Sequence, residues 1–165
     1  MQPRKIIKHR EIIEDNFRYV TDASELAAGG DIIVDLAIWN EHKTQLQRHA
    51  GKVGVQITGD AEPEVIADDL NQLAVIAIQF PVFRDGRGFS LARILRDRLG
   101  FKGELRATGD VLRDQLFFMQ RCGFDAFEPR ADRSIEDALQ GLSDFSVIYQ
   151  ADANEKRPIY RRRAN

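Results

Sequence analysis

The chain has 165 residues, 43% of them hydrophobic and 30% charged, which is the composition of an ordinary globular protein with an apolar core. The formal net charge of −2 excludes a general electrostatic attraction to nucleic acid or to anionic membranes. The longest apolar run, Leu73 to Phe83, contains Gln79 and Pro81 and is too short to span a bilayer.

The N-terminal region alternates short apolar runs with polar residues. Residues 4–20 predict one or two short strands of a β-hairpin, and "DIIVDL" (31–36) predicts a further strand. The opening "MQPRKIIKHREII" lacks an apolar core of signal-peptide length, so we expect a cytoplasmic protein. From Trp39 to Ala50 apolar residues recur at helical spacing, which predicts a helix that Gly51 ends.

Predicted strands and helices alternate from there on. The strand at 73–80 is apolar at almost every position, as expected for a central parallel strand that helices cover on both faces. Helices are expected to begin near Pro63, at Ser90 and at Asp110 as N-caps, and at the capping-box pattern "SIED" (134–137). Gly100 and Gly123 are expected to end the second and third of them. The other predicted strands cover residues 52–58, 103–108, 125–129 and 145–150.

Similar short motifs between predicted strands and helices indicate repeated βα units. "ITGD" (57–60) and "ATGD" (107–110) each separate a strand from a helix, and "RLGF" and "RCGF" each separate a helix from a strand. Such alternation predicts an α/β fold with a mostly parallel sheet and an N-terminal β-hairpin. Around five units are too few for a full eight-stranded barrel, so a partial barrel or an open doubly wound sheet remains. We expect one domain over residues 1–150 and a polar, flexible tail over 151–165.

The stretch "FRDGRGFS" (83–90) is a candidate oxyanion site. Ligands of parallel α/β folds bind beyond the carboxyl ends of the strands, and this loop follows the strand at 73–80. Arginines give charge-assisted hydrogen bonds to oxyanions, and glycines let backbone N–H groups approach them. The candidate anion-binding residues are Arg84, Gly86, Arg87, Gly88 and Ser90, and neighbouring loops add the rim residues Asp60, Asp85, Thr108, Asp110 and Arg130.

Other readings of these residues stay open. Asp85-Gly86 is a common turn pair, and the arginines would equally serve ion pairs at an ordinary surface turn. The loop lacks the third glycine of a dinucleotide fingerprint and the lysine of a P-loop. His42 and His49 lie seven residues apart on one predicted helix without an evident third ligand, so no metal site is expected. The single cysteine, Cys122, excludes an internal disulfide and is expected to be a packed thiol.

The segment from Phe80 to Arg130, "FPVFRDGRGFSLARILRDRLGFKGELRATGDVLRDQLFFMQRCGFDAF" and the residues after it, resembles the bacterial family catalogued as domain of unknown function 934. The preceding "VGVQITGDAEPEVIADDLNQLAVIAIQF" is similar to it as well. The residues that carry the motif are Arg84, Asp85, Gly86, Arg87, Gly88, Ser90, Arg93, Arg96, Arg106, Gly109, Asp110, Arg113, Asp114, Arg121, Cys122 and Gly123.

The resemblance implies a place in sulfate assimilation. Members of that family are usually encoded beside the haem subunit of assimilatory sulfite reductase and are often labelled as oxidoreductases of sulfite reduction. It thus implies an accessory protein that acts with or on the haem subunit, and a small oxyanion as ligand. The alternative is an oxidoreductase or small-anion enzyme with a borrowed cofactor. Neither a catalytic residue nor a resident cofactor follows from the sequence.

Overall fold

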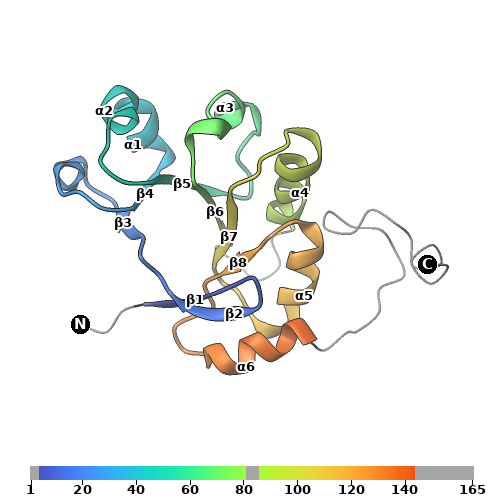
Figure 1. The fold of residues 1–165 in the computed structure, drawn as a ribbon. Helices are drawn as coiled ribbons and strands as arrows, with labels where there is room; N and C mark the ends of the chain where they lie inside the picture. The colour runs from blue at the N-terminus through green and yellow to red at the C-terminus, as the bar shows by residue number, and fades with distance from the viewer. Residues whose placement is uncertain (1–3, 81–85, 144–165) are drawn as a thin grey trace, which may run out of the picture.

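The computed structural model describes residues 4–80 and 86–143, whose eight strands form one curled sheet (Figure 1). The strand order is β2-β1-β8-β7-β6-β5-β4-β3, and every pair from β3 to β8 is parallel. Because consecutive strands are neighbours, the sheet is a half-barrel and not a doubly wound sheet. The strands are β1 (Lys5–Lys8), β2 (Glu11–Glu14), β3 (Arg18–Val20), β4 (Ile32–Asp35), β5 (Val53–Thr58), β6 (Val75–Phe80), β7 (Glu104–Gly109) and β8 (Ala126–Phe127).

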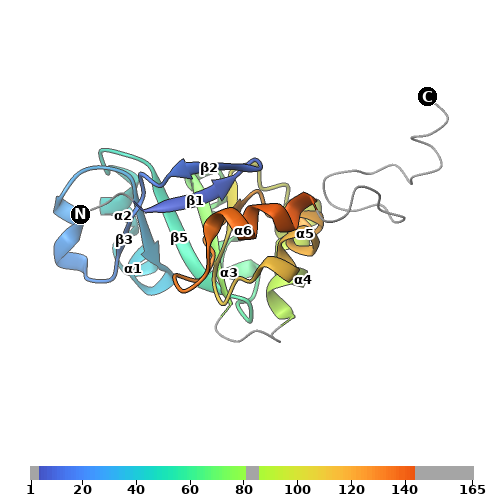
Figure 2. The same ribbon diagram turned by 90° about the horizontal axis from the view of Figure 1, so that it is seen from below.

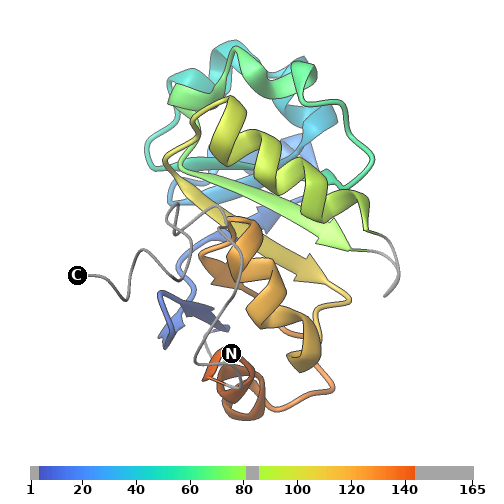
Figure 3. The same cartoon turned by 90° about the vertical axis from the view of Figure 1, so that its right-hand side faces the viewer.

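The helices lie along the outer, convex side of this sheet (Figure 1). Viewed from the right-hand side, α4 and α5 run side by side across it (Figure 3), and the two helices are in contact. The α-helices are α1 (Leu36–Glu41), α2 (Lys43–Gln47), α3 (Glu64–Ala67), α4 (Arg87–Arg93), α5 (Arg113–Cys122) and α6 (Ile135–Gln140). Short 3-10 helices η1 (Ala23–Ala27), η2 (Leu70–Gln72) and η4 (Gly141–Ser143) and the π-helical turn η3 (Ile94–Arg98) complete the described chain.

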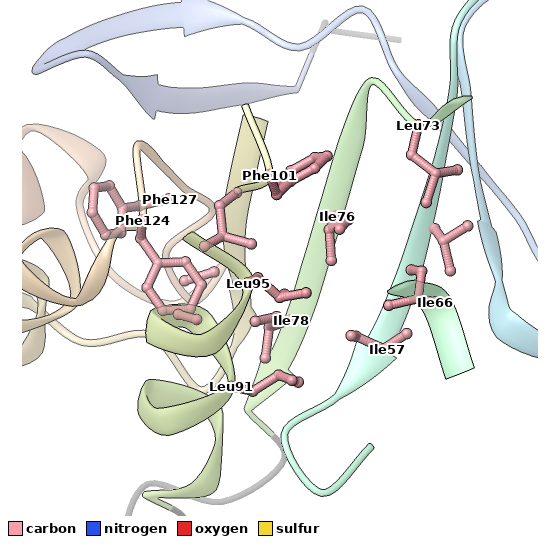
Figure 4. Close-up of a cluster of buried hydrophobic side chains, with 14 of the residues drawn as sticks. Ile57, Ile66, Leu73, Ile76, Ile78, Leu91, Leu95, Phe101, Phe124 and Phe127 are labelled. Carbon is pink, nitrogen blue, oxygen red and sulfur yellow. The ribbon is translucent and has the colours of Figure 1, made fainter. Parts of the chain in front are cut away.

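The main core fills the layer between the sheet and the helices (Figure 4). Alternate residues of β5 and β6, such as Ile57, Ile76 and Ile78, point into this layer and are almost fully buried. Leu91 of α4 and Leu95 of η3 meet them from the helical side. Since side chains alternate between the two faces of a strand, the residues between these isoleucines must face the concave side.

The concave face is covered by the chain itself and not by helices. Val75 and Ala77 of β6 form a small second cluster with Ile33, against which Phe17 and Tyr19 pack. Phe17 lies in the segment that connects β2 with β3, and Tyr19 lies within β3. The expectation that helices cover both faces of β6 is therefore wrong, because β6 is apolar on its concave side for contact with these aromatic residues.

The predicted N-terminal hairpin is confirmed. His9 and Arg10 connect β1 with β2 and have φ angles of 52° and 66°, the left-handed values that a tight two-residue hairpin turn requires. In the view from below, the hairpin crosses the upper part of the picture (Figure 2), and β1 pairs antiparallel with β8 through Ile7 and Phe127. The first strand of the chain thus extends the parallel sheet at its last described strand.

Two predicted helix starts are wrong. Ser90 lies inside α4, which begins three residues earlier at Arg87. Asp110 precedes α5, but this helix begins only at Arg113, with Leu112 in the N-cap position. Both expectations rested on the residue type alone, and the structure places each side chain where it caps no helix N-terminus.

Other helix boundaries agree with the sequence. Ser134 accepts a hydrogen bond from the backbone N–H of Asp137 at 3.1 Å, as the capping pattern predicts. Gly123 ends α5 with a φ of 116°, which a residue with a Cβ adopts only with strain. The helix expected from residue 39 begins earlier, at Leu36 after the N-cap Asp35, and breaks at His42 into α1 and α2.

The predicted strand at 145–150 and the polar tail lie outside the described residues. Among the helices that the structure describes, none has both the length and the apolar character needed to cross a membrane.

Candidate functional site

The carboxyl ends of the parallel strands β5, β6, β7 and β8 form one rim of the half-barrel. Gly59, after β5, packs so closely on the start of α4 that a Cβ on it would lie 2.6 Å from the backbone nitrogen of Gly88. Gly109, at the end of β7, has a φ of 86°, and the next N–H, of Asp110, donates to the Phe80 carbonyl at 2.7 Å. The Thr-Gly-Asp segment after β5 therefore meets the start of α4, and the one after β7 meets the end of β6, at the same edge of the sheet.

The candidate anion-binding residues of this rim are only partly described. Gly86 precedes α4, Arg87 is its exposed first residue, and Gly88 is buried against the ring of Phe80. Ser90 is exposed in the middle of the helix.

Arg84 and Asp85 lie outside the described residues. Anion binding by this loop therefore stays a prediction. Of its two arginines, Arg87 is the one that the structure describes.

Arg130 and Asp110 of the predicted rim are brought together. The guanidinium of Arg130 donates to Asp110 at 3.1 Å and to both oxygens of Asp132, at 3.1 and 2.9 Å. The hydrogen bond and charge of Asp132, and then those of Asp110, raise the pKa of Arg130. Arg130 thus ties the loop after β7 to the loop after β8, and its charge is already matched by carboxylates.

Asp60 and Thr108 complete the set of predicted rim residues. Asp60 accepts a hydrogen bond from the hydroxyl of Thr58 within its own loop. Thr108 is 4% exposed, and its hydroxyl has no hydrogen-bond partner among the residues that the structure describes. Because Ala107 points into the helix-covered core, the side chain of Thr108 faces the concave side.

A buried charge cluster, which the sequence analysis missed, lies on the concave face below this rim. Arg106 of β7 is fully buried and binds both carboxylate oxygens of Asp15, at 2.9 and 3.1 Å. Its Nε also donates to Glu104 at 2.7 Å, and Glu104 pairs with Lys8 at 3.0 Å. Burial alone would lower the pKa of Arg106, but Asp15 and Glu104 outweigh it and raise that pKa.

Arg4 extends the cluster toward the carboxyl end of β8. It pairs with Asp15 and, at 3.1 Å, with Glu128, and its guanidinium lies 4.5 Å from the ring centre of Tyr19. The Tyr19 hydroxyl donates to Glu128 at 3.1 Å, and burial together with the Glu128 charge raises the pKa of that hydroxyl. The cluster joins the N-terminal segment to β7 and β8, and each of its charges has an opposite charge beside it.

Acid should weaken this cluster. Burial raises the pKa of Asp15, but the hydrogen bond and charge of Arg106 outweigh burial and hold it below the usual 3.8. The stability that Asp15 contributes is therefore present above the ordinary carboxyl pKa and is lost as the pH falls through the lower folded value. We expect the urea midpoint of the wild type to fall from pH 5 to pH 2.5 more steeply than that of Asp15→Asn. Urea midpoints of the wild type and of Asp15→Asn that fall equally steeply over this pH range would contradict the expectation.

Hollows of the described surface lie at both ends of the half-barrel. One of about 230 Å³ lies beyond β7 and β8, between the starts of α5 and α6, where Arg113 pairs with Asp137 at 2.7 Å. A larger one of about 460 Å³ lies at the opposite end, against the loops that precede β5 and β6, and none of the predicted rim residues lines it. Size alone therefore does not identify the site.

The histidines do not form a shared metal site in the described chain. His42 lies at the break between α1 and α2, whereas His49 lies beyond α2 with its Nε2 2.7 Å from the carbonyl oxygen of Gly30. No group of three or more metal-binding side chains occurs in residues 4–80 and 86–143. Cys122 is 2% exposed at the end of α5, as expected for a packed thiol.

The family model described as bacterial protein of unknown function (DUF934) matches residues 54–160. The chain belongs to the DUF934 family. The matched region contains β6, β7, β8 and the rim loops that follow them, whereas Asp15 and the hairpin precede it. No curated protein matches the DUF934 chain.

Proposed function

We propose that this DUF934 protein is an accessory protein of sulfate assimilation that binds a small sulfur oxyanion at the rim of the half-barrel and acts with or on the haem subunit of sulfite reductase. The observation that carries the proposal is the contact between Gly59 and Gly88. That contact brings the loop after β5 to the start of α4, where Arg87 is exposed.

The rim supplies the chemistry that such an anion needs. Arginine gives charge-assisted hydrogen bonds that suit sulfite or sulfate oxygens. Arg130 is held by Asp110 and Asp132. Arg87, exposed at the start of α4, is the arginine of the candidate loop that the structure describes, and we include Arg84 from the sequence motif. The carboxyl end of a parallel sheet is also where ligands of such folds bind.

Replacing the two arginines tests the oxyanion site. For Arg84→Ala/Arg87→Ala we expect an unfolding midpoint close to that of the wild type, because exposed ion pairs contribute only about 0–1 kcal/mol. Loss of charge-assisted bonds should weaken binding of sulfite, sulfate or adenylyl sulfate by roughly tenfold or more. Calorimetric titration with each anion measures this change. The matched control is Arg98→Ala, which removes a 62% exposed arginine of η3 away from the rim.

The result distinguishes a role of the two arginines in ligand binding from a role in stabilising the fold. A double variant that unfolds without any ligand would show that the arginines stabilise the fold. Unchanged affinity for every anion that the wild type binds would overturn the site. Co-purification with the haem subunit tests the partner, and loss of the complex in Arg84→Ala/Arg87→Ala but not in Arg98→Ala would place that contact at the rim.

A second candidate function is an enzyme of sulfite reduction with a borrowed cofactor. The observation that favours it is the polar concave face beneath the rim, where the buried hydroxyl of Thr108 has no hydrogen-bond partner among the described residues. An absorption spectrum of the freshly purified protein distinguishes the two functions, since bound flavin or haem absorbs visible light. A spectrum with protein absorption alone, also after addition of either cofactor, would argue against this candidate.

A further inference from the structure

A row of hydrogen-bonding side chains crosses the concave face at the rim. Thr58, Gln79 and Thr108 are neighbours on β5, β6 and β7, because Thr58 pairs with Gln79 and Gln79 pairs with Thr108 in the parallel register. Glu128 continues the row after β8, where its backbone N–H donates to the Ala107 carbonyl at 2.9 Å. Each member follows a residue that packs into the helix-covered core, so all four face the concave side.

Most of the row is already engaged. The Thr58 hydroxyl donates to Asp60, and Glu128 accepts from Tyr19 at 3.1 Å. Gln79 accepts a bond from Gln56 through its Oε1, at 3.4 Å, and its amino group makes no hydrogen bond within residues 4–80 and 86–143. The remaining hydrogen-bonding capacity of the row is thus in the middle, at Gln79 and Thr108.

The buried hydroxyl of Thr108 is the unusual member. A buried polar group without a hydrogen bond costs about 1–3 kcal/mol, so native proteins hold few of them. The hydroxyl of Thr108 lacks a partner within the described chain, although the residue is only 4% exposed. It therefore marks a place where a bound molecule would supply the missing bond.

The charges beside this place are compensated. Glu128 is paired with Arg4 at 3.1 Å, and Arg106, one layer deeper on β7, is paired with Asp15 and Glu104. A ligand at the middle of the row therefore meets uncharged donors, an amide N–H and a hydroxyl, and the carboxylates of Glu128, Asp15 and Glu104 near it are each paired with an arginine. Such donors suit an oxygen acceptor.

We propose that Thr108 and Gln79 form a subsite that binds one oxygen of the small oxyanion on the concave face. The proposal rests on the proposed oxyanion function and deepens it, since it places the anion on the concave face, below the carboxyl ends of the strands. The same chemistry would bind a carboxylate, and the choice of probe distinguishes the two.

The test replaces the hydroxyl while keeping the shape of the side chain. Thr108→Val should bind sulfite about tenfold more weakly than the wild type in calorimetric titration, because one hydrogen bond to a charged acceptor is lost. Its unfolding midpoint without ligand should be equal to or higher than that of the wild type, since the unpaired buried hydroxyl is removed. Thr108→Ser should keep affinity within about threefold, because it keeps the donor. Thr58→Val is the control, since its hydroxyl already bonds to Asp60.

Each outcome decides one of the two proposals. If Arg84→Ala/Arg87→Ala loses sulfite binding while Thr108→Val keeps wild-type affinity, the subsite is overturned and the rim function stands. If the wild type binds neither sulfite nor sulfate, the proposed oxyanion function fails and the subsite for that anion fails with it. If acetate but not sulfite shows the Thr108→Val loss, the ligand is a carboxylate, which overturns the assignment to a sulfur oxyanion.

Discussion

Asp15→Ala should destabilise the protein by about 3–5 kcal/mol, the usual cost of leaving a buried charge without its partner. The side chain of Arg106 is 1% exposed. It makes two hydrogen bonds to Asp15 of the N-terminal segment, and the Asp15 carboxylate balances its charge. Of the two carboxylates that bind Arg106 in the described chain, Glu104 would remain beside the guanidinium. Urea unfolding followed by circular dichroism measures the loss as a lower midpoint.

Two further variants isolate the cause. Arg106→Met in the Asp15→Ala background should recover part of the loss, because a buried apolar side chain carries no desolvation cost. Arg4→Ala, which removes a 38% exposed partner of the same carboxylate, should cost clearly less than Asp15→Ala. An Asp15→Ala midpoint that lies above the Arg4→Ala midpoint would show that burial does not set the energetics of this cluster.

Arg96→Ala should cost about 2–4 kcal/mol, since it leaves backbone carbonyls without their charged donor. Its Nε donates to the Gly123 carbonyl at 2.8 Å, and its Nη1 donates to the carbonyls of Phe101 and Gly103 at 2.9 and 2.7 Å. Its Nη2 also pairs with Asp125 at 3.2 Å. One side chain thereby fastens the loop after η3 to the loop after α5, and a thermal melt would show the loss.

The neighbouring helix turn offers a matched control. Arg93 has 44% of its side chain exposed and lies 3.8 Å from Asp97, so Arg93→Ala should cost less than about 1 kcal/mol. Arg96→Lys keeps the charge but not the several donors of the guanidinium, and should fall between the wild type and Arg96→Ala. Equal melting temperatures for Arg93→Ala and Arg96→Ala would show that Arg96 does not stabilise the fold by holding these two loops together.

Local sequence patterns predicted the βα units because the forces that form them are local. Apolar strands such as β6, the stop at Gly123 and the cap at Ser134 each depend on residues close in sequence. The helix start at Asp110 was wrong because a good N-cap residue can also serve an ion pair, here with Arg130. The start at Ser90 was wrong because serine can also lie on the exposed side of a helix interior.

The buried cluster could not be predicted in the same way. Arg106 and Asp15 are 91 residues apart, and only the return of the N-terminal segment across the concave face brings them together. A signal was nevertheless present in "ELRATG", where polar residues Glu104, Arg106 and Thr108 alternate with apolar ones. That alternation indicates a strand with one polar face. The sequence did not reveal whether that face meets solvent or an ion pair.

The place of β1 beside β8 has a consequence for how the chain folds. From β3 to β8 each strand pairs with the next one along the chain, so these contacts close short loops and can form progressively. The hairpin precedes these strands in the chain but pairs with β8, which is made much later. Because the bond between Asp15 and Arg106 joins residues 91 positions apart, we expect it to form late in folding. Interactions that form after the folding barrier mainly slow unfolding, so this ion pair would lengthen the lifetime of the native state without speeding its formation.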